Sequence, residues 1–431
     1  MILGKTALTS RPWIILPVVL CAGFLALAVT PTMRRAIEAT RALEALEAVG
    51  HQAEADSKAH LNRVSPLPMR EVRYFIDGRF RTADLYLDSA APKASLVLVP
   101  GADVLGREHP QFQALAAVLS RFGFAVLVPH MENLQHLRIR VSDITQIADA
   151  AQHMARFAPK KSGPSVGILA VSYGVGPAVL AALDKQARPD VRYVLGIGGY
   201  YDLEAVLTYL TTGKFRARPG DRWQTAEPRA HGKWVFLASN VEYLENPQDQ
   251  VTLRLVANRK FADPQADISD LTPMLSPQVE VVLELITNTD PARVPVLIDS
   301  LPEGALANFR ALDVSERDLS DLHARLILIH GRGDRLIPFT ESQALARAAN
   351  RTPGGASLYI IDNMAHVTLA PSDAVDAWKL FRAVFELLTL RDAAPAPTIP
   401  RALAKPFDLQ GAASGEEAAP DTAKKSERND Q

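Results

Sequence analysis

The sequence predicts an α/β protein built on a mostly parallel, doubly wound sheet. Short runs of consecutive apolar residues recur along the chain, and such runs are typical of strands buried on both faces of a parallel sheet. Segments with helical periodicity separate these runs, so strands and helices alternate. The alternation stops at residue 200 and resumes after residue 322, which indicates a helical insertion within one sheet.

The chain begins with a long interval without charge, residues 12–33, between Arg11 and Arg34. As a helix this interval would span roughly 33 Å, which is enough for the core of a bilayer. The sequence therefore predicts a transmembrane anchor within residues 1–33, with a cleaved signal peptide as the alternative. Positive charges nearly balance across the interval, and by analogy with signal-anchor proteins we expect the rest of the chain on the extracytoplasmic side.

The remaining chain divides into five segments. Residues 34–69 begin with strong helix formers and are expected to form a helical stalk or linker. The sheet is expected in two parts, residues 70–199 and 323–390, separated by a cap insertion over residues 200–322. Residues 391–431 are rich in Ala, Pro and charge and are expected to be disordered.

The sheet itself is expected to begin with a hairpin over residues 71–88, because Asp77-Gly78 is a typical two-residue turn. Buried strands are then expected at residues 94–100, 124–129, 165–171, 191–199, 324–331 and 357–362. Helices are expected between and after them, at residues 112–122, 141–157, 175–184, 341–349 and 373–389.

Composition argues against several classes of function. The 431-residue chain has a formal net charge of −1, which gives no support for nucleic-acid binding. Its one cysteine, Cys21, lies in the N-terminal apolar interval, so neither structural disulfides nor cysteine-ligated zinc is expected. No spacing of histidines and carboxylates is typical of a metal site, and residues 196–199 are too short for a dinucleotide fingerprint. We therefore expect no metal and no cofactor.

The stretch of residues 165–178 predicts a nucleophile elbow, in which a strand turns sharply into a helix with a serine at the tip. An apolar run ends in Ser172, and Ala170 and Gly174 flank it as A-x-S-x-G, where G-x-S-x-G is usual. Small flanking residues are needed because the strand and the helix pass close together. Taken alone, the motif fits an ordinary strand-to-helix loop equally well.

Two more residues lie where a serine nucleophile needs them. Ligand sites in open parallel sheets lie outside the carboxyl ends of strands, and both Asp334 and His366 follow predicted strands. An imidazole can take the proton of a serine and return it to a leaving group, while a carboxylate fixes the imidazole tautomer. We therefore predict Ser172 as the nucleophile, His366 as the base and Asp334 as the orienting acid.

A serine nucleophile also requires donors for the oxyanion that forms during the reaction. One expected donor is the backbone N–H of Tyr173, the residue after the nucleophile. The second is expected in the loop after strand 94–100, at the N–H of Ala102.

Together these features resemble the α/β-hydrolase fold over about residues 70–390. The resemblance is carried by the A-x-S-x-G elbow, the loop after the first long parallel strand, the segment His330-Gly-x-x-Asp334, and the final Asn363-x-x-His366. It implies a Ser/Asp/His hydrolase with a cap over the site. The chain departs from the family pattern at Ala170 and at Pro100-Gly101, where many members carry His-Gly.

Alternatives stay open for several of these residues. Asp202 follows strand 191–199, where some members of this fold place their acid. His130 and His136 flank a loop after strand 124–129, although a surface role is expected for both. The aromatic residues at the start of the insertion form its own small core, line a pocket, or do both.

The predicted function is a membrane-anchored serine hydrolase that cleaves a carboxylic ester through an acyl-enzyme. Its expected partners are a small-molecule ester or acyl substrate and, through residues 12–33, a membrane. An acyltransferase or a peptidase with the same triad is the first alternative. The second is a non-catalytic envelope scaffold that retains the fold.

Overall fold

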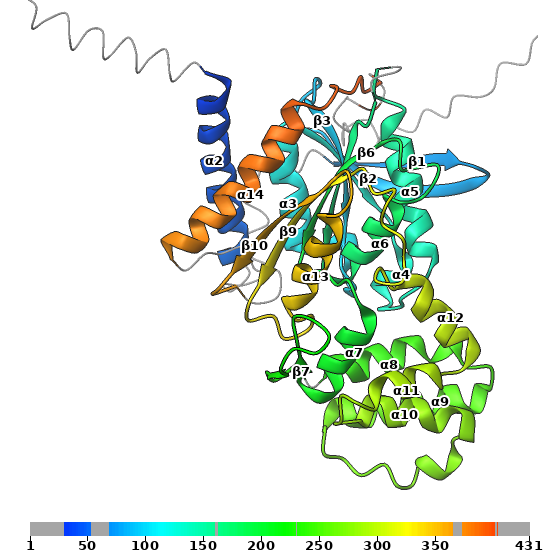
Figure 1. Ribbon diagram of the computed structural model, residues 1–431. Coiled ribbons are helices and arrows are strands. Elements are labelled where there is room, and N and C mark those ends of the chain that lie inside the picture. The colour runs from blue at the N-terminus through cyan, green and yellow to red at the C-terminus, as the bar shows by residue number, and fades with distance from the viewer. Residues whose placement is uncertain are drawn as a thin grey trace, which may run out of the picture.

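The computed structural model describes residues 30–52, 69–159, 163–229, 231–364, 373–400 and Leu403. These residues form an eight-stranded sheet between two layers of helices, with a second group of helices at one end (Figure 1). The predicted anchor lies almost wholly outside the described residues. Among the helices that are described, none combines the length and apolar character needed to cross a membrane.

The predicted hairpin is present at one edge of the sheet, as β1 (Met69–Ile76) and β2 (Arg79–Tyr86). Asp77 and Gly78 have φ angles of 48° and 81°, and a type I′ turn requires positive φ at both of its central residues. Strand β2 also pairs antiparallel with β4, so the hairpin forms the antiparallel side of an otherwise parallel sheet.

The other six strands run parallel, which confirms the predicted mostly parallel sheet. The order across the sheet is β1-β2-β4-β3-β5-β6-β9-β10. Every residue of β3, β4 and β5 is buried, as expected for central strands covered on both faces. The parallel strands are β3 (Ala94–Val99), β4 (Phe124–Pro129), β5 (Val166–Val171), β6 (Val191–Ile197), β9 (Arg325–Gly331) and β10 (Ala356–Ile361).

Helices cover both faces of this sheet, and each face buries its own apolar cluster. One face is covered by α5 (Ser142–Ala155), α6 (Val175–Ala181) and α13 (Thr340–Ala349). The other face is covered by α2 (Pro31–Gln52), α3 (Pro110–Arg121) and α14 (Ala374–Asp392). This arrangement fits the α/β-hydrolase fold that the sequence resembles.

Both ends of the described chain pack against this core. Helix α2, expected as a stalk or linker, lies beside α14 (Figure 1), and the buried Arg391 of α14 donates a 2.6 Å hydrogen bond to Glu38 of α2. Residues 393–400, expected in a disordered tail, also pack on the core. There the N–H of Thr398 donates to the carbonyl of Phe157 at 2.7 Å, and Ile399 is buried.

The insertion forms a mainly helical cap beyond the carboxyl ends of the strands (Figure 1). Three of its helices share an apolar core of their own, which includes Trp234, Leu253 and Leu283. This separate core explains why the strand and helix alternation is lost there. The cap contains α7 (Leu203–Thr212), β7 (Lys214–Phe215), β8 (Gln224–Thr225), α8 (Gly232–Asn240), α9 (Pro247–Ala262), α10 (Pro277–Thr287), α11 (Val294–Asp299) and α12 (Glu303–Leu312).

Candidate active site

Ser172 lies at the sharp turn between β5 and α6. Its φ angle is +54°, in the left-handed region that residues other than glycine rarely adopt. Such a conformation costs about 1–3 kcal/mol and persists only where the surroundings impose it. Val171 and Tyr173 are buried whereas Ser172 is half-buried, so the serine is the accessible side chain of the turn. This is the local geometry of a nucleophile elbow.

The turn leaves no room for side chains at the glycines that follow the serine. A β-carbon at Gly174 would lie 2.6 Å from the carbonyl oxygen of Pro100, and one at Gly176 would lie 2.2 Å from the ring of Tyr200. Ala170, which stands in place of the usual first glycine, is fully buried in the core. Residues without a side chain are therefore required at Gly174 and Gly176, on the helix side of the turn.

The loop after β3 runs directly beside Ser172. A β-carbon at Gly101 would lie 3.1 Å from Cβ of Ser172 and 3.8 Å from its Oγ. The next residue, Ala102, is exposed, and among the described residues its N–H donates no hydrogen bond. The N–H of Asp103 donates to the carbonyl of Leu134 at 3.1 Å, which holds the loop in place. The loop that we predict to supply an oxyanion donor thus borders the serine.

Asp334 occupies the turn after β9 and is 5% exposed. Its Oδ1 accepts hydrogen bonds from the N–H groups of Leu336, at 2.8 Å, and Ile337, at 3.0 Å. The hydroxyl of Tyr209 donates to its backbone carbonyl at 3.1 Å. These bonds fix the position of the carboxyl group and its orientation at the end of the strand.

His330 is fully buried beneath this turn and has a structural role. Its Nε2 lies 3.0 Å from the carbonyl of Ile337 and 3.4 Å from Oδ2 of Asp334. Its Nδ1 lies 2.7 Å from the hydroxyl of Ser342. The ring therefore holds the turn against α13.

His366 lies outside the described residues, but the chain on its N-terminal side approaches Asp334. The N–H of Arg332 donates to the carbonyl of Ile361, the last residue of β10, at 2.9 Å. A β-carbon at Gly333 would lie 3.5 Å from the carbonyl oxygen of Met364. The segment that leads to His366 thus runs beside the turn that carries Asp334.

The three alternative candidates, Asp202, His130 and His136, all have local structural partners. Asp202 caps α7, because its side chain accepts from the N–H of Ala205 at 3.0 Å. His130 contacts the side chain of Gln135 at 3.1 Å. His136 contacts the carbonyl of Glu132 at 2.9 Å. These contacts explain each residue without a catalytic role.

A buried carboxyl group next to the elbow, Asp143, was not predicted from the sequence. The hydroxyl of Tyr173 donates to it at 3.1 Å, and the ring of Tyr173 stacks on Tyr200. Burial raises the pKa of Asp143 to about 6, although hydrogen bonds from Asn133, the Arg140 N–H and Tyr173 act in the opposite direction. The sequence feature that could have indicated this residue is its position as an acidic side chain in the first turn of the predicted helix 141–157.

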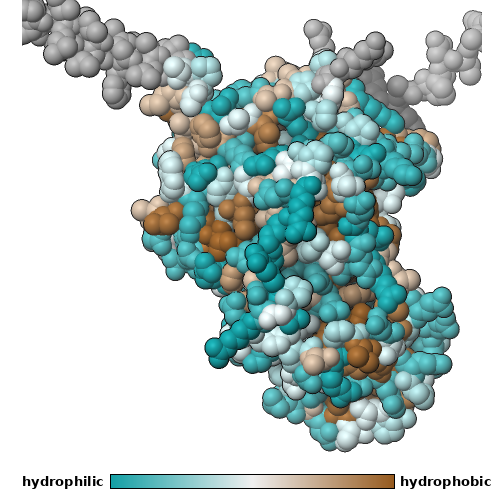
Figure 2. Space-filling view, viewed as in Figure 1, coloured by the Kyte–Doolittle hydropathy of each residue, from teal (hydrophilic) through white to brown (hydrophobic). Residues whose placement is uncertain are grey.

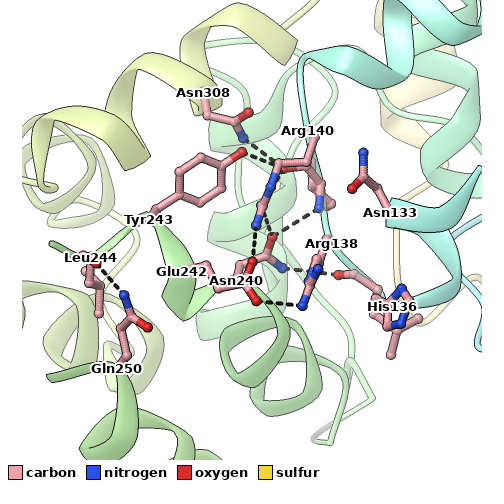
Figure 3. A network of polar contacts seen from close by, with 12 residues as sticks. Asn133, His136, Arg138, Arg140, Asn240, Glu242, Tyr243, Leu244, Gln250 and Asn308 are labelled. Atoms are coloured by element: carbon pink, nitrogen blue, oxygen red, sulfur yellow. Dashed lines mark hydrogen bonds and ion pairs between the residues drawn. The ribbon is translucent and has the colours of Figure 1, made fainter. Parts of the chain in front are cut away.

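The loop that precedes Asp143 also holds the cap (Figure 3). Asn240 of the cap accepts from the N–H of Ile139 at 3.0 Å and from Arg140 at 3.1 Å. The hydroxyl of Tyr243 donates to the carbonyl of Ile139 at 2.9 Å, and the guanidinium of Arg140 lies over its ring. Glu242 pairs with Arg140 at 3.3 Å. The cap is therefore docked by a dense polar network.

Within the described ranges, no group of three or more His, Cys, Asp or Glu side chains is placed to hold a metal ion. The chemistry that the described site offers is that of a serine hydroxyl, a fixed carboxyl group and backbone N–H donors.

Comparisons with known proteins give distant structural matches. No family model and no curated protein matches the sequence. The acylaminoacyl peptidase of Pyrococcus horikoshii is 11% identical with a TM-score of 0.43, over 82% of this chain and 45% of the peptidase. An esterase from Thermogutta terrifontis is 12% identical with a TM-score of 0.41, over 75% and 94% of the two chains. A 2,6-dihydroxy-pseudo-oxynicotine hydrolase is 13% identical with a TM-score of 0.40, over 78% and 72%.

This chain thus matches less than half the length of the peptidase.

Proposed function

We propose that this chain is a serine hydrolase that cleaves a carboxylic ester through an acyl-enzyme. The left-handed φ angle of Ser172, at the carboxyl end of a central strand, carries the proposal. The proximity of Gly101 to the serine side chain supports an adjacent oxyanion site. The fixed carboxyl group of Asp334, beside the segment that leads to His366, supports the remainder of the triad.

In this proposal, Oγ of Ser172 attacks the ester carbonyl carbon while His366 accepts the hydroxyl proton. The N–H groups of Ala102 and Tyr173 stabilise the oxyanion. His366 then protonates the leaving alcohol as the carbon–oxygen bond breaks, which leaves the acyl group on Ser172. Water attacks this ester with His366 as the base, releases the acid and restores the serine. Asp334 orients the imidazole and stabilises its protonated form.

The test of this proposal is the turnover of p-nitrophenyl esters by purified wild-type and Ser172→Ala proteins. Loss of the nucleophile is expected to lower kcat by about 10⁴-fold or more. Ser300→Ala is the matched control, because Ser300 lies in the cap and its hydroxyl donates to the carbonyl of Val296, one helix turn earlier. Undiminished turnover in Ser172→Ala would contradict the proposal. Product analysis with an added alcohol or a peptide substrate separates ester hydrolysis from acyl transfer and peptidase activity.

We also propose that residues 12–33 anchor the protein in a membrane, with the α/β core on the extracytoplasmic side. The proposal rests on the uncharged length of this interval. Protease added to intact spheroplasts should then digest the core. Full protection of the core under these conditions would contradict this orientation.

A further inference from the structure

A pocket of about 710 Å³ lies between α7, the β7–β8 hairpin and α13. Its volume is within the range of small-molecule sites. Neither Ser172 nor Gly101 nor Asp334 is among its lining residues. The helix α13 lies above β7 and α7 in Figure 1, and the corresponding surface in Figure 2 is largely hydrophilic. We call it the arginine pocket, after its lining residues Arg216, Arg218, Arg347 and Arg351.

Four arginine side chains line the same cavity. Burial lowers the pKa of Arg347, and the charges of Arg218 and Arg351 act in the same direction, whereas those of Asp221 and Glu341 act against them. Arg347 is held in place by a hydrogen bond that it donates to the carbonyl of Ala217 in the hairpin. Among the described residues, the charge of Arg216 acts on the carboxyl group of Glu204, while no carboxylate lies within ion-pair distance of Arg218 or Arg351. Such a group of like charges favours the binding of an anion.

Three carboxyl groups also line the arginine pocket, and two of them have structural partners. Asp202 caps α7. Glu341 accepts hydrogen bonds from the N–H groups of Tyr201, at 3.1 Å, and Asp202, at 2.8 Å. Burial raises the pKa of Glu341 to about 8, so this group is mostly neutral at pH 7. The lining holds four arginines against three carboxyl groups, so the pocket keeps a positive balance even when Glu341 is ionised.

A buried hydroxyl and an exposed ring complete the pocket. Thr340 is 2% exposed, and its Oγ1 has no hydrogen-bond partner among the described residues. A buried hydroxyl without a partner is destabilising, and an acceptor group on a ligand would relieve this cost. Trp223 is partly exposed beneath the guanidinium of Arg216, whose carbon lies 4.2 Å from the ring centre. The ring gives the hairpin wall a flat apolar surface.

We propose that the arginine pocket binds a small organic anion through phosphate or carboxylate groups, with Arg216, Arg218 and Arg347 as donors and Thr340 as a further polar contact. Guanidinium groups suit this role because their paired N–H donors match the oxygens of both anions. Ser172 is not among the lining residues, so the proposed binding does not depend on the ester chemistry.

The test is calorimetric titration of the purified full chain with pyrophosphate and, separately, with citrate at low salt. We expect saturable binding of at least one of them, with a Kd below about 1 mM. Tighter binding of pyrophosphate would assign the site to phosphate compounds, and tighter binding of citrate to carboxylates. Absence of saturable binding for both anions would overturn the proposal.

Two arginine variants and a control locate the binding. Arg347→Gln and Arg218→Gln should each weaken binding by about tenfold. Arg218 is exposed, so this second variant leaves the fold intact. Arg254→Gln is the control, because Arg254 is an exposed arginine on α9 outside the pocket. Equal affinity in Arg218→Gln, Arg347→Gln and wild type would overturn the proposal.

Two further variants, Thr340→Val and Ser172→Ala, test whether the Thr340 hydroxyl contributes to anion binding and whether the proposed nucleophile does. Valine has the shape of threonine without the hydroxyl, so Thr340→Val should raise the Tm of the free protein and weaken binding of the anion. Ser172→Ala should bind with wild-type affinity. Because the readout is binding, this result is independent of whether the proposed esterase activity is found.

Discussion

The hydroxyl of Tyr173 lies 3.1 Å from Oδ2 of Asp143, in the interior behind the proposed nucleophile. Tyr173 follows Ser172 directly, and Asp143 lies in the first turn of α5. Asp143 also accepts a hydrogen bond from the N–H of Arg140, whose side chain contacts the cap. One carboxyl group therefore connects the elbow, α5 and the loop that docks the cap.

Removal of this hydroxyl should affect catalysis more than binding. We expect Tyr173→Phe to lower kcat for ester hydrolysis by about tenfold with little change in KM. Without the hydroxyl, the backbone N–H of residue 173, the proposed oxyanion donor, is no longer fixed in position. Tyr200→Phe is the control, since Tyr200 stacks on Tyr173 and donates to the carbonyl of Leu312. Equal losses of kcat in the two variants would argue against a positioning role for the Tyr173 hydroxyl.

The close packing behind the elbow predicts that Gly174 does not tolerate a side chain. Gly174→Ala should lower the free energy of unfolding by more than about 2 kcal/mol, because the new methyl group meets the backbone carbonyl of Pro100 at 2.6 Å. Gly304→Ala is the control, since a β-carbon at this helical position finds no neighbour closer than 3.6 Å. Urea denaturation should show Gly304→Ala to be neutral or stabilised by up to about 1 kcal/mol.

The contacts of Asp334 and Asp202 predict that replacement by asparagine lowers the esterase activity at the first position and leaves it largely unchanged at the second. Asp334→Asn should lower kcat by about 10⁴-fold, as expected when the histidine loses its orienting carboxylate. Asp202→Asn should retain most of the activity, because asparagine also caps helices well. Esterase kinetics on the two variants check this assignment. A large loss of kcat confined to Asp202→Asn would make Asp202 the catalytic acid.

The raised pKa of Glu341 predicts that the stability of the protein depends on pH. Its pKa rises from 4.5 to about 8 in the folded protein, so the folded state holds this proton more tightly than the unfolded chain. The resulting stabilisation is present at low pH and is lost as the pH rises from about 4.5 to about 8. Glu341→Gln stays neutral, so its stability relative to wild type should increase over this range by a few kcal/mol.

Denaturation of both proteins at about pH 5 and about pH 8.5 measures this difference. A constant difference in the free energy of unfolding between wild type and Glu341→Gln would show that Glu341 does not titrate in this window.

Much of the core could be predicted because its strands are continuous apolar runs and its hairpin turn is Asp77-Gly78. The parallel order also made the placement of Ser172 and Asp334 predictable, since parallel strands share one carboxyl edge. The long helix α9 was not predicted, because charged residues interrupt its apolar positions. Its buried face includes Leu253 and Val256, which only the fold of the cap reveals.

Buried polar residues were harder to predict. Asp143 and Glu341 each lie in the first turn of a helix, where an acidic side chain usually serves at the surface. Their burial comes from tertiary contacts with Tyr173 in one case and with the start of α7 in the other. The packing of α2 on α14 has the same origin, because Arg391, which the sequence places at the start of the charged tail, is buried by its contact with Glu38.

The central claim is that Ser172 is a nucleophile, and covalent labelling tests it most directly. The purified protein is treated with a fluorophosphonate probe, and the modified peptide is identified by mass spectrometry. We predict a single adduct on Ser172 that is absent from Ser172→Ala and unchanged in Ser300→Ala. Absence of labelling at Ser172, or labelling only at another serine, would contradict the proposed catalytic role of Ser172.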